Sequence, residues 1–64
     1  MDKFLTHEAL DRTNICVEAI ESLIYNHPYF EENKELQYKI GSALVLLSEV
    51  YQAVGAEHFN TINN

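Results

Sequence analysis

The sequence has few of the residues with which a small protein compensates for a short chain. Its 64 residues include one cysteine, Cys16, so no disulfide can form within the chain. The three histidines and this cysteine are scattered, without the spacing of a zinc site. A chain of this size buries only about 60% of the surface that its unfolded form exposes, so a monomer is marginally stable. Self-association is the stabilising device that remains, and we expect a homodimer.

Basic residues are also scarce. The chain has ten acids against four Lys and Arg, which gives a formal net charge of −6. Non-specific binding to nucleic acids depends on the neutralisation of phosphates by Lys and Arg, and anionic membrane surfaces attract the same residues. We therefore expect neither nucleic acid nor membrane as a direct partner.

Glycine is limited to Gly41 and Gly55, so the chain has no glycine-rich phosphate loop. No Ser-His-Asp spacing occurs, and His7 begins the run His-Glu-Ala-Leu-Asp rather than a zinc-binding HExxH motif. Cys16 falls on an apolar helix face, where we expect a buried, inert thiol. These observations predict no enzyme, no metal and no cofactor. A metal- or thiol-dependent enzyme is the alternative, and it would require His7 or Cys16.

Long apolar runs are missing as well. The most apolar stretch, residues 40–56, contains Glu49 and small polar residues, and it is too short to span a bilayer. The N-terminal sequence MDKFLTHEAL lacks the apolar core of a signal peptide. Together with the single free cysteine, this pattern leads us to expect a cytoplasmic protein.

Helical periodicity is the strongest signal that is present. Apolar residues recur at seven-residue intervals along three adjacent lines, which start at Ala9, Leu10 and Thr13 and form one broad apolar face. The spacing predicts a helix over about 6–25, with Thr6 as its N-cap. The sequence Asn26-His27-Pro28 then ends the helix, because a residue before proline avoids the α region.

A second helix is predicted over about 33–54, after a turn at 26–32. Asn33 is a plausible cap at its start. Gly55 stands where a left-handed residue often ends a helix. We expect the tail, residues 56–64, to fold back or fray.

The predicted second helix carries one charge, Glu49, between Ile40 and Ala56. A helix with apolar or small residues around most of its circumference is usually buried on more than one side. The first helix can cover only one of these sides. We therefore expect the second helix to pair with its copy through a dimer interface on the outer face. This face carries Tyr38, Gly41, Val45 and Ser48.

The predicted architecture is an all-α, single-domain antiparallel helical hairpin over residues 1–64 that dimerises into a four-helix bundle. This plan is similar to that of the Rop-type helical hairpins, in architecture alone. The RNA binding of that family needs basic residues on the first helix, where this chain has only Arg12. The resemblance therefore implies the bundle and not the function.

The leading functional hypothesis is a small acidic protein-binding module, acting as an adaptor, a chaperone-like partner or an inhibitor of a larger protein. Its size is typical of accessory proteins of phages, plasmids and mobile elements. Tyr29 and Phe30 either close the end of the hairpin or form an exposed recognition patch. The alternative is a nucleic-acid mimic that blocks a DNA- or RNA-binding protein. Its acidic helix face would comprise Asp11, Glu18 and Glu21.

Overall fold

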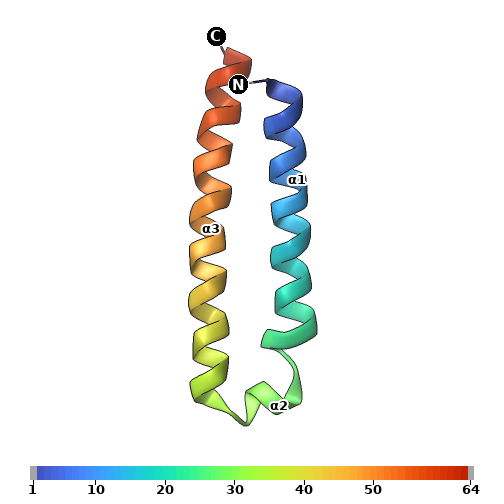
Figure 1. Ribbon diagram of the computed structural model, residues 1–64, viewed down its shortest axis with the longest axis vertical. Coiled ribbons are helices and arrows are strands. Elements are labelled where there is room, and N and C mark those ends of the chain that lie inside the picture. The colour runs from blue at the N-terminus through green and yellow to red at the C-terminus, as the bar shows by residue number, and fades with distance from the viewer. Residues whose placement is uncertain (1, 64) are drawn as a thin grey trace.

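The structure, a computed structural model, describes residues 2–63 and the side chains of residues 2–60. The elements in chain order are α1 (Lys3–Ile20), the π-helical η1 (Glu21–Tyr25), α2 (Pro28–Glu31) and α3 (Lys34–Asn63). No strand occurs within residues 2–63, so the prediction of an all-α fold is confirmed. The helices α1 and α3 run side by side in opposite directions, and α2 lies at the bend between them (Figure 1).

The start of α1 differs from the prediction that Thr6 caps it. The helix begins at Lys3, and the side chain of Asp2 accepts a hydrogen bond from the Phe4 N–H at 2.8 Å. Aspartate is as good an N-cap as threonine, and it lies earlier in the chain. Thr6 is thereby inside the helix, where it faces α3 and is 4% exposed.

The end of this first helical segment is widened into the π-helix η1. A π turn contains about one residue more than an α turn, so it rotates the side chains that follow it. The sequence pattern places Tyr25 on the outer face. In the structure Tyr25 is half-buried, and its ring lies against Gly41 of α3. A Cβ atom at position 41 would lie 3.3 Å from Tyr25 Cε2, so this close approach favours glycine.

The bend is built by local hydrogen bonds around Pro28. His27 is the N-cap of α2, and its Nδ1 accepts a hydrogen bond from the Tyr29 N–H at 3.1 Å. Pro28 takes the first helical position, where its missing N–H costs nothing. The Gln37 side-chain amide donates to the Tyr25 carbonyl at 2.9 Å. This bond satisfies a carbonyl at the end of η1 and ties α3 to it.

The prediction that the second helix stops at Gly55 is wrong. Gly55 has no positive φ, and α3 continues to Asn63, so residues 56–63 of the predicted tail are helical. Gly55 packs near Leu10, and the next turn places His58 against Thr6. Contacts with α1 therefore extend beyond the glycine and support the helix there. Met1 and Asn64 lie outside the described residues.

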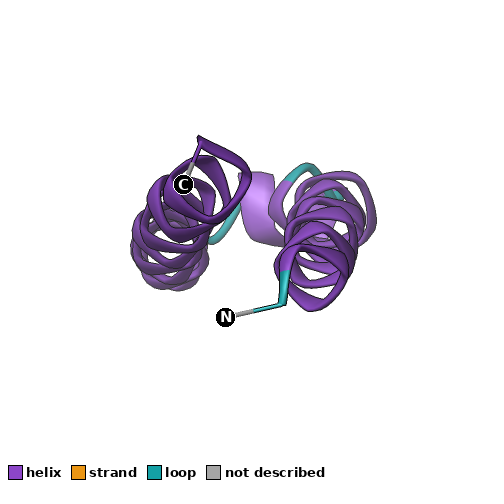
Figure 2. Ribbon diagram, turned by 90° about the horizontal axis from the view of Figure 1, so that it is seen from above, coloured by secondary structure: helices purple, strands orange, loops and turns teal. Residues whose placement is uncertain are grey.

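The contact between α1 and α3, which we call the seam, is the largest contact between elements in the described part of the chain. Its apolar members are only half-buried, and no apolar side chain among residues 2–60 is fully buried. Seen from above, the two long helices form a single layer (Figure 2), with Cα extents of 48 × 15 × 11 Å. The half-buried apolar residues of the seam include Leu10, Val17, Ile20, Ile40, Leu44, Leu47 and Val54.

The contact between Tyr25 and Gly41 predicts non-additive substitutions. Gly41→Leu places a branched side chain where the Tyr25 ring lies, so it should lower the melting temperature measured by circular dichroism. In a Tyr25→Ala background the same change meets open space and gains helix propensity, by about 1 kcal/mol. We expect the loss caused by Gly41→Leu to shrink or reverse there. Equal losses in both backgrounds would contradict this contact.

Candidate protein-binding surfaces

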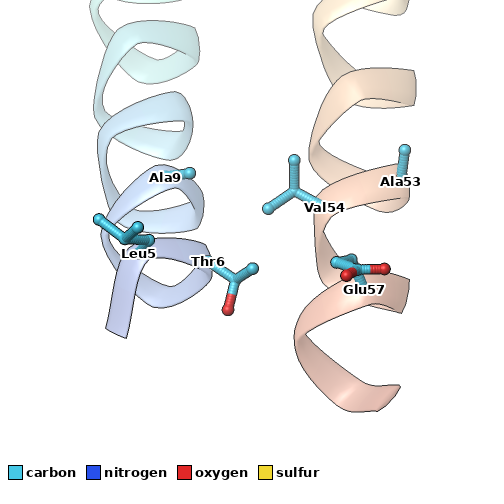
Figure 3. A pocket seen from close by; sticks show the side chains of 6 residues that line it. All are labelled: Leu5, Thr6, Ala9, Ala53, Val54 and Glu57. Carbon is cyan, nitrogen blue, oxygen red and sulfur yellow. The ribbon is translucent and has the colours of Figure 1, made fainter. Parts of the chain in front are cut away.

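A single layer of two helices has two broad faces, and they differ in character. On one face an apolar groove of about 440 Å³ runs between α1 and α3. Thr6 and Val54 point into the space between the helices, and the other side chains form the flanks (Figure 3). The lining residues are Leu5, Thr6, Ala9, Ala53, Val54 and Glu57.

The groove is the end of a longer stripe along α1. Residues seven apart lie on nearly the same line of a helix, because seven residues make almost two turns. Steps of seven from Leu5 and Ala9 reach Arg12, Cys16 and Ala19 within α1. Leu5 is 52% exposed and Cys16 is also exposed, so α3 leaves much of this stripe uncovered.

A matching stripe runs along α3. Steps of seven backwards from Glu57 and Ala53 reach four apolar residues and Lys39. Leu46 is 63% and Val50 49% exposed. We call the two stripes together the groove face. Its α3 members are Leu36, Lys39, Ala43, Leu46, Val50, Ala53 and Glu57.

The opposite face is polar. Two shallow hollows on it are lined by polar residues of both helices together with parts of the seam: His7, Leu10, Asp11, Asn14, Val17, Ser48, Tyr51 and Gln52. Steps of seven extend this polar face from Asp11 to Glu18 and from Gln52 to Val45 and Tyr38. The structure thus places three residues of the predicted dimer interface, Tyr38, Val45 and Ser48, on the same face as two of the predicted recognition acids.

Gly41 is the exception among the predicted interface residues. It is half-buried, and it faces Tyr25 of its own chain. The sequence pattern places Gly41 on the outer face of the predicted second helix, toward a second copy. The contact within the chain already accounts for the glycine.

The other candidate partner-binding residues are spread along the molecule. Asp11, Glu18 and Glu21 are all exposed, and Glu18 Oε1 accepts a hydrogen bond from the Asn14 amide at 3.3 Å. Tyr29 is 59% exposed, whereas Phe30 is half-buried. Their rings meet edge-to-face, with centroids 5.2 Å apart. Phe30 therefore contributes to packing at the bend, and Tyr29 presents an aromatic surface held in place by it.

The expectation that Cys16 is buried is wrong, because its side chain is exposed. The sequence projection joined the lines through Ala9, Leu10 and Thr13 into one face. The structure separates them. The lines through Leu10 and Thr13 contact α3, and the line through Ala9 and Cys16 lies on the groove face. One neighbouring helix is too narrow to cover all three lines.

Thr6, the one buried polar residue among residues 2–60, belongs to a cluster that joins the ends of α1 and α3. The Thr6 hydroxyl lies 2.7 Å from His58 Nδ1, and either group can donate depending on the imidazole tautomer. The hydroxyl oxygen also lies 3.0 Å from the Lys3 carbonyl, to which it donates its single proton when His58 Nδ1–H is the donor in the other contact. The rings of His7 and His58 are 5.8 Å apart. Sequence reasoning missed this cluster, because it had assigned Thr6 to a cap and His58 to a frayed tail.

The described part of the chain lacks both a candidate metal site and a membrane-spanning helix. No group of three or more His, Cys, Asp and Glu residues within it could hold a metal ion. None of its helices combines the length and apolar character needed to cross a membrane. Comparison of the chain with protein-family models, curated proteins and solved structures found no match.

The cluster at Thr6 predicts a specific loss of stability. Thr6→Val keeps the shape of the side chain but removes the hydroxyl that contacts His58, which should cost about 1 kcal/mol. At fixed protein concentration this loss lowers the melting temperature by about 4–8 °C. Thr13→Val is the matched control, since Thr13 is a half-buried threonine on the same side of α1. A similar fall for both variants would show that the Thr6 hydroxyl has no special role.

Proposed function

We propose that the chain is a small acidic, non-enzymatic protein-binding module that acts as a homodimer of helical hairpins. The observation that carries this proposal is the incomplete interior. No apolar side chain among residues 2–60 is buried, whereas thirteen large apolar side chains are exposed. Burial of apolar surface is the main favourable term in folding, so a chain that leaves this much uncovered needs another protein surface.

The exposed area supports the same conclusion. A compact monomer of this mass is expected to expose about 4,200 Å². The chain exposes 4935 Å², about 700 Å² more. A typical stable interface buries about 800 Å² on each partner. Covering one face of the helix pair would therefore bring the exposed surface close to that of an ordinary folded protein.

Surfaces that remain after dimerisation are the ones that would meet a further protein, as in an adaptor, a chaperone-like partner or an inhibitor. Tyr29 offers an exposed ring at the bend, held edge-on by Phe30. Aromatic anchors of this kind are enriched among residues that dominate binding energy.

A nucleic-acid mimic remains the second candidate, favoured by the arrangement of charge. Asp11 and Glu18 are exposed and lie on one line of α1, about 10 Å apart along the helix axis. Two of the four basic residues, Arg12 and Lys39, lie on the groove face instead. Carboxylates held on a rigid helix can occupy a basic groove of a DNA- or RNA-binding protein.

The proposed homodimer predicts a stability that depends on concentration. Dilution from micromolar to nanomolar should dissociate the dimer and lower both the helical circular-dichroism signal and the melting temperature, because partner binding stabilises the folded state by mass action. Sedimentation velocity at the same concentrations reports the mass directly. A fully helical monomer across the whole range would overturn the proposal.

The two candidate functions differ in their dependence on salt. If the module binds through apolar contacts, a protein that co-purifies from the native host should dissociate little between 50 and 500 mM salt, although the Debye length falls roughly threefold over this range. The binding of this co-purifying protein should be lost in the Tyr29→Ala variant. A mimic instead predicts steep salt dependence and loss with Asp11→Lys/Glu18→Lys. Glu35→Lys is the control, since Glu35 is an exposed acid at the start of α3.

A further inference from the structure

We infer that the surface on which the second copy docks is the groove face, and not the face that carries Tyr38, Val45 and Ser48. The inference rests on the proposed homodimer and adds the location of its interface. Both faces carry exposed apolar residues, so exposure alone does not show which face is the interface. The positions of these residues in the helical repeat distinguish the two faces.

Every position of the groove face comes directly before a position of the seam. On α1, Leu5, Ala9 and Cys16 precede Thr6, Leu10 and Val17. One residue corresponds to a rotation of about 100° around a helix. The groove-face stripe of α1 is thus turned by about a quarter of a circle from the stripe that contacts α3.

The same offset occurs on α3, where Ala43, Leu46 and Ala53 precede Leu44, Leu47 and Val54. The groove that joins Leu5 and Ala9 to Ala53 and Glu57 shows that both offset stripes lie on one side of the helix pair. In a four-helix bundle each helix contacts two neighbours, which lie at about this angle from each other. Each helix therefore has one stripe for its partner in the chain and one for a helix of a second copy.

A second copy fits this face in size. The helix pair measures 48 × 15 Å between Cα atoms in the plane of the face. Its area, on the order of 700 Å², is close to what each partner of a stable dimer buries. A two-fold dimer also brings identical patches together, so a flat face with two apolar stripes is complementary to itself.

Charge supports the same assignment. Two chains of net charge −6 repel each other unless their acids point away from the interface. The groove face contains Glu57 against two bases, Arg12 and Lys39, and Arg12 forms an ion pair at 3.5 Å with Glu8 beside the stripe, so the charges around this face nearly balance. The polar face contains Asp11, Glu18 and the side chains of the two hollows. Burying these groups without new hydrogen-bond partners would cost free energy.

Adjacent residues of α3 provide a matched test. Leu46 lies on the groove face and is 63% exposed, whereas Val45 lies on the polar face and is 59% exposed. We expect Leu46→Glu to raise the dimer dissociation constant by at least about 100-fold, because the two-fold axis buries two added carboxylates. Val45→Glu should change it by less than about threefold. Both constants come from sedimentation equilibrium. A large effect of Val45→Glu with none of Leu46→Glu would place the interface on the polar face and overturn the inference.

Cys16 allows a second test on the unmodified chain, which stays valid even if Leu46→Glu fails to fold. It is the one cysteine of the sequence, it is exposed in the single chain, and it lies in the α1 stripe of the groove face. We expect its reaction with a thiol reagent to slow by about tenfold or more as protein concentration rises and dimer forms, since only the monomer then reacts.

The outcomes separate this inference from the proposed function. Dimerisation without protection of Cys16 would refute the groove-face interface and leave the homodimer in place. A monomer at every concentration, with constant thiol reactivity, would refute both.

Discussion

The structure depends on one geometric constraint: a helix can cover only one stripe of a single neighbour. Each of the two long helices carries apolar residues over a wider arc than that. The seam between α1 and α3 uses the stripe through Leu10 and Val17 on one side and that through Leu44 and Leu47 on the other. The adjacent stripes stay in solvent, and no apolar side chain of residues 2–60 reaches full burial. The exposed apolar stripes, and hence the surfaces available for binding another protein, result from the absence of a second layer that would cover them.

Three contacts hold the register of the helix pair, two near the bend and one at the opposite end. Near the bend, the π turn directs Tyr25 onto Gly41, and Gln37 binds the carbonyl that the turn leaves free. At the other end, the Thr6 hydroxyl meets His58. A sliding of α3 by one turn, about 5.4 Å, would lose all three contacts. These contacts therefore set which residues of the two helices are level with each other, and hence the groove that joins their offset stripes.

The two faces of the layer suit different roles. The groove face is apolar and nearly neutral, which is suited to permanent coverage by a like surface. The polar face combines acids, small hydroxyl and amide side chains, and a few apolar residues around Val45, which is closer in character to the surface of a transient interface. In the proposed dimer Asp11 and Glu18 of each chain remain on the outside, where they are solvated or meet a basic partner.

Periodicity, the proline and the composition by themselves determined that the chain is all helical, that the helices break near Asn26, and that their apolar surface exceeds what the pair can cover. These features depend on local spacing, which a sequence displays directly. Only the tertiary structure decided which apolar line is covered. The exposed Cys16, the inward Tyr25, the reason for Gly41 and the passage of α3 through Gly55 all follow from contacts between residues distant in sequence. The apolar lines of the first helix differ by a rotation of 100° or less. Which of them is covered and which is exposed therefore depended on the position of the second helix.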